Sequence, residues 1–152
     1  MEKDHVPVYT VPHLDRMLFY TKNRIERDYV IWDLAKKNLT RKEIAKKLGL
    51  TPSVVTYVVL NAQAIGTEEE IEEYFKLGFE LNDFFVERLV DPNTHLITVL
   101  RSCLRHNIKS KAQLKAASRY DIHRICESHA MKRADYGACE ALVAYYDKLN
   151  KI

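Results

Sequence analysis

Hydrophobic residues recur at helical spacing along most of the chain, and the most ordered stretch of this pattern covers residues 39–60. Apolar positions there fall on one face of each of two short helices. Between these faces, Gly49 can adopt the left-handed conformation that ends a helix at no steric cost. The pattern therefore predicts two helices joined by a tight turn, with inward positions Ile44, Ala45, Leu48, Val55 and Val58.

Capping signals fix where these two helices begin. Thr40 followed by Glu43 has the spacing of a capping box, and Thr51 followed by Pro52 suits the start of the second helix. Two short helices with a glycine turn predict a helix-turn-helix unit. Residues 26–61 resemble the helix-turn-helix superfamily of DNA-binding proteins at the structural positions Ala45, Gly49, Val55 and Val58.

A preceding segment, residues 26–37, reads as the supporting helix of this unit. Ile31, Leu34 and Ala35 share one face, and Trp32 is expected to cover the core. Residues 1–66 are thus predicted to be an N-terminal arm followed by a helix-turn-helix domain.

Residues 67–92 predict one long amphipathic, acidic helix. Thr67 and Glu70 form a second capping box, and the Asp91–Pro92 pair stops the helix after about Val90. Its apolar surface is wide enough to cover more than one neighbour, either both halves of the chain or a second copy of the same helix. The apolar set is Ile71, Tyr74, Phe75, Leu77, Phe79, Leu81, Phe84, Phe85, Val86 and Leu89.

Residues 93–152 predict four further helices, the last over residues 132–149. The spacing of Ile108, Ser110, Leu114, Ser118, Asp121, Ile122 and Ile125 carries a resemblance. It resembles the C-terminal domain of the bacterial RNA polymerase alpha subunit, a helix-hairpin-helix-like fold. In that family a glycine-containing hairpin contacts DNA phosphates. The corresponding residues 126–135 contain no glycine here, which leaves the side chains of Lys132 and Arg133 as expected contacts.

The predicted fold class is therefore all-α. A helix-turn-helix unit is joined by an acidic amphipathic helix, residues 67–92, to a four-helix domain of the alpha-subunit type. Composition agrees with a globular protein, because 47% of residues are hydrophobic and 30% are charged. No apolar run has the length of a membrane span, and residues 1–9 lack the apolar core of a signal peptide. Three cysteines, an odd number, indicate reduced thiols in a cytoplasmic protein.

Charge is unevenly distributed along the chain. Residues 1–66 have a net charge of +4, residues 67–92 of −7 and residues 93–152 of +6, which together give the overall +3. Two basic regions flank an acidic one. This pattern suits two phosphate-binding surfaces separated by a segment that repels phosphate, and also suits uneven but solvated helix faces.

The second helix of the unit, from Pro52 to about Asn61, is the expected recognition helix. Hydroxyl and amide side chains can bond base edges, whereas lysine and arginine bind phosphate. The apolar residues Val54, Val59 and Leu60 leave open a shape-led readout or a protein partner. The expected base contacts are Thr51, Ser53, Thr56, Tyr57 and Asn61. The expected phosphate contacts are Lys36, Lys37, Arg41, Lys42, Lys46, Lys47, Lys132 and Arg133.

Catalytic and metal-binding motifs are not apparent. Cys103 with His106 and His123 with Cys126 have a spacing that zinc ligands can use, but no Cys-x-x-Cys knuckle accompanies them, and we expect no metal or cofactor. No phosphate-binding glycine loop or nucleophile elbow occurs, so an enzyme is not expected.

The sequence thus predicts a sequence-selective DNA-binding protein, of the kind found in bacterial or phage transcriptional regulators. The alternative is a protein-interaction adaptor that uses the helix-turn-helix fold without reading bases. Expected partners are double-stranded DNA, a second copy of the chain and RNA polymerase, with no membrane contact.

Overall fold

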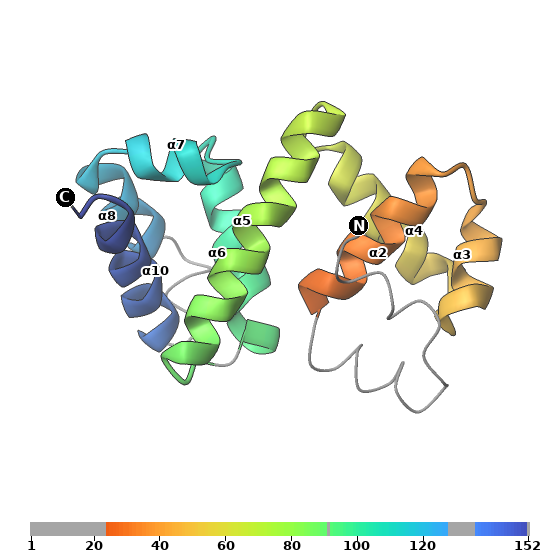
Figure 1. Cartoon of the computed structure of the whole chain (residues 1–152), viewed down its shortest axis with the longest axis horizontal. Helices are drawn as coiled ribbons and strands as arrows, with labels where there is room; N and C mark the ends of the chain where they lie inside the picture. The colour runs from red at the N-terminus through yellow and green to blue at the C-terminus, as the bar shows by residue number, and fades with distance from the viewer. Residues whose placement is uncertain (1–23, 91, 128–135, 152) are drawn as a thin grey trace. The chain divides into compact units, whose positions relative to one another are not determined.

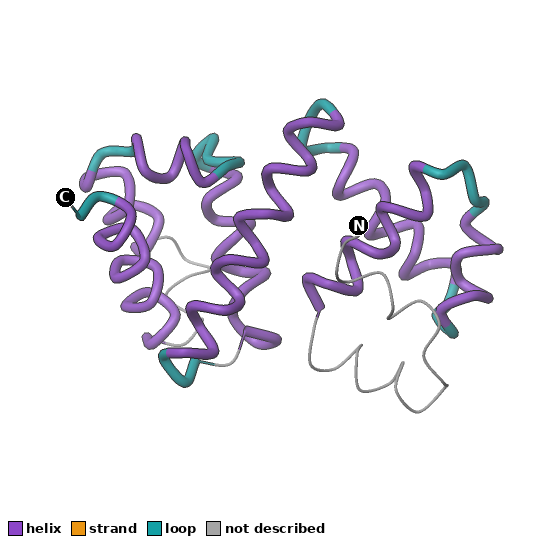
Figure 2. The backbone as a smooth tube through the Cα atoms, in the orientation of Figure 1, coloured by secondary structure: helices purple, strands orange, loops and turns teal. Residues whose placement is uncertain are grey.

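The computed structural model describes residues 24–90, 92–127 and 136–151, which form helices joined by short loops (Figure 2). These ranges contain no strand, which confirms the all-α prediction. The chain divides into two compact units, Met1–Gly66 and Thr67–Ile152. The predicted N-terminal arm lies outside the described residues.

Unit 1 consists of α2 (Arg24–Lys36), α3 (Arg41–Leu48) and α4 (Pro52–Gln63) (Figure 1). α4 packs against both α2 and α3, so that the three helices enclose one small core. Trp32 is buried, as expected. The core side chains are Val30, Ile31, Leu34, Ile44, Ala45, Leu48, Val55, Val58 and Val59.

The ends of α3 are set by the local signals that the sequence predicts. The backbone N–H of Glu43 donates to Thr40 Oγ1 at 3.1 Å, and the N–H of Thr40 donates to Glu43 Oε1 at 2.8 Å. Because the bond from the Thr40 N–H stabilises the ionised carboxylate, the pKa of Glu43 is lowered. At the other end Gly49 has φ 70° and ψ 33°, and the following N–H, that of Leu50, donates to Ala45 O at 2.9 Å. The predicted capping box and glycine turn are both confirmed.

Unit 2 is built around α5 (Glu68–Glu87), which packs against α6 (Pro92–Arg105), α7 (Lys111–Ala116) and α10 (Tyr136–Leu149). α8 (Arg119–Glu127) contributes two isoleucines to the buried set. The predicted connecting helix is therefore an integral part of this unit. Its core includes Leu77, Leu81, Phe85, Leu96, Val99, Leu100, Cys103, Leu114, Ile122, Ile125, Ala141 and Leu142.

α5 ends at Glu87, earlier than the predicted end near Val90. Leu89 takes a left-handed conformation with φ 61°, and the N–H of Val90 donates back to Phe85 O at 2.8 Å. This turn closes the helix before Pro92 can act as the stop. The start of the last helix, predicted at Lys132, lies outside the described residues, and its described part begins at Tyr136.

Candidate nucleic-acid interface

α3 of unit 1 carries a group of solvent-exposed cations. Arg41, Lys42, Lys46 and Lys47 are all exposed, and within the described residues none of them has an ion-pair partner. Lys42, Lys46 and Lys47 point away from the buried face that Ile44, Ala45 and Leu48 form, whereas Arg41 is exposed because it lies in the first turn, at the end of that face. A short amphipathic helix with this arrangement can present four positive charges to a polyanion while its other face stays in the core.

The start of α4 is presented by the turn that follows α3. Thr51 Oγ1 accepts from the N–H of Val54 at 3.3 Å, which satisfies one of the donors at the helix N-terminus. Pro52 follows at the first helical position, as predicted. Thr51, Pro52 and Ser53 are all exposed, so the first turn of α4 is open to a ligand.

The five expected base contacts differ in accessibility. Thr51, Ser53, Tyr57 and Asn61 are exposed, with Tyr57 at 55%, whereas Thr56 is only half-buried. The hydroxyl of Thr51 already serves as a cap. Ser53, Tyr57 and Asn61 are therefore the residues of α4 best placed to contact a partner.

The apolar residues of α4 do not form one exposed face. Val59 is buried in the core and Val54 packs against it, while Leu60 is 52% exposed. Most of the unusual hydrophobicity of this helix therefore fills the core of unit 1. Only Leu60, next to Tyr57 at helical spacing, remains as an exposed apolar contact.

Two of the predicted phosphate contacts are partly engaged within α2. Lys37 Nζ lies 3.0 Å and Lys36 Nζ 4.0 Å from the carboxylate of Asp33, and Lys36 Nζ also lies 6.0 Å from the Trp32 ring centre. These contacts reduce the charge that α2 offers to a phosphate, in contrast to α3. Lys132 and Arg133 lie outside the described residues.

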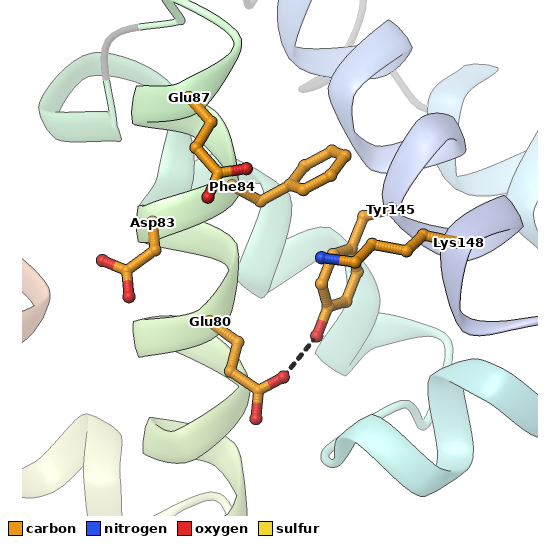
Figure 3. Close-up of a pocket in the computed structure, with 6 residues that line it drawn as sticks. All are labelled: Glu80, Asp83, Phe84, Glu87, Tyr145 and Lys148. Carbon is orange, nitrogen blue, oxygen red and sulfur yellow. Dashed lines mark hydrogen bonds between the residues drawn. The ribbon is translucent and has the colours of Figure 1, made fainter.

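Unit 2 contains an open cleft of about 180 Å³ between α5 and α10, which sequence reasoning did not predict (Figure 3). Tyr145 donates to Glu80 Oε1 at 2.9 Å, and Lys111 Nζ lies 3.0 Å from the same oxygen. Burial raises the pKa of Glu80, but the bonds from Lys111 and Tyr145 outweigh it, so the net shift is downward. The lining residues are Glu80, Asp83, Phe84, Glu87, Tyr145 and Lys148.

Cationic side chains of the chain itself already lie near the aromatic ring of this cleft. Its carboxylates and aromatic rings would favour a cation, but Lys148 Nζ lies 5.5 Å and Arg88 Cζ 5.7 Å from the ring centre of Phe84. The chain's own cations therefore take the aromatic face that a cationic ligand would use. No sequence signal indicates this cleft, because its residues come from helices about 65 positions apart.

No three histidine, cysteine or acidic side chains within residues 24–90, 92–127 and 136–151 come together as metal ligands. Within the same ranges, no helix has both the length and the apolarity needed to cross a bilayer.

Comparison with known proteins gives no relative for this fold or interface. No protein-family model matches the chain, and neither the curated proteins nor the solved structures contain a significant match.

Proposed function

We propose that the chain is a DNA-binding protein of the regulatory type, in which α3 and α4 act as a helix-turn-helix. The single observation that carries this proposal is the exposed group of α3 cations, Arg41, Lys42, Lys46 and Lys47, directly before the open N-terminal turn of α4. Cations bound to phosphates fix the register of a protein on a duplex, and the adjacent helix then meets base edges in the major groove.

The two helices have separate tasks in this proposal. α3 supplies affinity that depends on salt, because each neutralised phosphate releases counterions. α4 contains no charged residue between Pro52 and Gln63, so it reads bases through hydroxyl, phenol and amide groups alone. Ser53, Tyr57 and Asn61 are the readers.

Charge reversal on α3 tests the phosphate contacts. We expect Lys46→Glu with Lys47→Glu to weaken binding to random duplex DNA on the order of 100-fold at about 0.1 M salt, and to reduce the salt slope by roughly 2. The measurement is fluorescence anisotropy across a salt series. The matched control is Lys115→Glu with Lys151→Glu, which changes the net charge equally at exposed positions of unit 2.

Two outcomes would count against this proposal. If the α3 variant binds like the unaltered chain, α3 does not contact phosphate. If the control loses as much affinity as the α3 variant, binding follows total charge and not this surface.

Base reading is tested separately with Ser53→Ala and Tyr57→Ala. Duplexes that bind the unaltered chain are first selected from a random pool. For each variant, we expect the preference for these duplexes, measured as their affinity divided by the affinity for unselected duplexes, to fall roughly tenfold. Equal losses on every sequence would assign these residues to phosphate contact.

The adaptor function is favoured by one specific observation, the exposed pair Tyr57 and Leu60 on α4. Aromatic and aliphatic residues of this kind serve as anchors in protein interfaces. If the chain retains no duplex even at low salt, the DNA-binding proposal fails and this pair becomes the candidate protein-binding surface.

A further inference from the structure

The three cysteines of the chain, distant in sequence, gather within unit 2. Cys103 on α6 is completely buried, whereas Cys126 near the end of α8 and Cys139 near the start of α10 are half-buried. No disulfide joins them. Two thiols of the group are therefore accessible and one is sealed in the core.

Cys126 and Cys139 contact each other reciprocally. Cys126 Sγ lies 3.9 Å from the carbonyl oxygen of Cys139, and Cys139 Sγ lies 3.9 Å from the carbonyl oxygen of Cys126. Because the contact is reciprocal, each side chain is directed toward the other residue. The two positions are 13 residues apart in the sequence, so folding of α8 and α10 is needed to bring them together.

The contact between Cys126 and Cys139 affects the pKa values of the two thiols in different ways. Burial and the neighbouring Cys139 raise the pKa of Cys126 to about 12. Burial also raises the pKa of Cys139, but a hydrogen bond from the Cys126 thiol opposes that rise. The hydrogen bond from the Cys126 thiol therefore favours the Cys139 thiolate. Burial raises the pKa of Cys103 to about 12 as well, and its complete burial keeps it out of reach of a reagent.

We propose that Cys126 and Cys139 are a redox modification site, at which a reversible disulfide links α8 to α10. The oxidant is a low-molecular-weight disulfide such as oxidised glutathione. The Cys139 thiolate attacks one sulfur of the oxidant, which forms a mixed disulfide and releases one small thiolate. Cys126 then loses its proton and attacks the sulfur of Cys139, which releases the second. Two protein thiols are oxidised by two electrons, and the two protons pass to the two small thiolates.

The raised pKa values have a kinetic consequence. Thiolate is scarce near neutral pH, so the exchange is slow and the dithiol persists under mild conditions. The reaction therefore responds to sustained exposure to the oxidant. This inference does not depend on the proposed DNA binding.

The test uses the full chain incubated with oxidised glutathione, followed by alkylation and mass spectrometry. We expect loss of two of the three alkylatable thiols, one cross-linked peptide pair containing Cys126 and Cys139, and complete reversal by dithiothreitol. Closing a loop of this length should raise the thermal midpoint by about 10 °C.

Serine variants test the order of the steps. Cys126→Ser should stop at a glutathione adduct on Cys139, whereas Cys139→Ser should leave Cys126 largely unmodified. Cys103→Ala should still form the cross-link, and circular dichroism of each variant checks that it folds.

Three results would overturn the proposal. These are retention of all three thiols after prolonged oxidation, a cross-link through Cys103, and a disulfide between two chains in place of the internal one. Peptide mapping of the unaltered chain distinguishes all three, even if a variant fails to fold.

Discussion

The two units differ in how their positive charges are used. On α3 of unit 1, four cations have no acidic partner in the described chain. In unit 2, three cations are joined to carboxylates on other helices: Lys109 to Glu70 at 3.3 Å, Lys111 to Glu80 at 3.0 Å and Arg119 to Asp147 at 2.7 Å. Three basic residues of unit 2 thus pair with acidic residues of α5 or α10, whereas the four on α3 of unit 1 face solvent.

This difference shows that net charge alone is a poor guide to which surface can bind phosphate. Residues 93–152 carry a charge of +6 against +4 for residues 1–66, so a ranking by net charge alone would make the C-terminal region the stronger phosphate binder. Several of its cations are, however, paired with α5 or with α10. Partner geometry, which only the fold supplies, decides which positive charges remain available for phosphate.

The largest expected effect concerns the small core of unit 1. Ile44→Ala removes a completely buried side chain and should destabilise this unit by about 3 kcal/mol. Hydrogen exchange followed by mass spectrometry should show lost protection in α2, α3 and α4 alone. The matched variant in unit 2 is Ile122→Ala, which should have the reverse pattern. If either variant reduces protection from exchange equally in both units, the two units unfold together and the comparison fails.

A smaller effect is expected at two left-handed positions, one in each unit. Gly49 has φ 70° and Leu89 has φ 61°, and the latter is 94% exposed. Gly49→Ala should cost about 1 kcal/mol, whereas Leu89→Gly should stabilise unit 2 by about 0.5 kcal/mol, because only glycine takes this conformation without a steric penalty. Denaturant midpoints measure both changes. Stabilisation by Gly49→Ala would show that the turn between α3 and α4 is not held as described.

The smallest effect is the response of the two capping boxes to acid. Hydrogen bonds from the Thr40 backbone lower the pKa of Glu43, and those from the Thr67 backbone, together with Lys109, lower the pKa of Glu70. A carboxyl whose folded pKa is lowered stabilises the fold above its ordinary pKa, and this contribution is lost as pH falls through the folded value.

The denaturant midpoints of both units should therefore decrease as the pH is lowered from about 6 to about 3. Glu43→Gln and Glu70→Gln should each flatten the acid response of its own unit, and Glu70→Gln more so because Lys109 also acts on Glu70. An unchanged pH profile in both variants would show that these carboxylates are not the groups that titrate.

The sequence predicted the features that depend on neighbouring residues. The capping boxes at Thr40 and Thr67, the turn at Gly49 and the start of α4 at Pro52 all arise from groups within four positions of each other. The ion pair of Lys37 with Asp33 likewise depends only on a local spacing of four residues on one helix. These signals are strong because backbone geometry near a helix end depends little on the rest of the fold.

Features that join distant helices could not be predicted in this way. The cleft residues Glu80 and Tyr145 and the contact between Cys126 and Cys139 depend on how α5, α8 and α10 pack. Of the candidate interface, the exposure of α3 was foreseeable from its amphipathic pattern. The burial of Val59 beside exposed Leu60 was not, because every residue near the middle of α4 is apolar or weakly polar.

The burial of Trp32 has a practical consequence for spectroscopy. It is the only tryptophan among the 152 residues, it lies on α2, and the residue is 6% exposed. Excitation at the red edge of indole absorption, where tyrosine contributes little, therefore yields emission from unit 1 alone. The native chain thus contains an intrinsic fluorophore for one of its two halves, and opening of that half should shift the emission to longer wavelength without any attached dye.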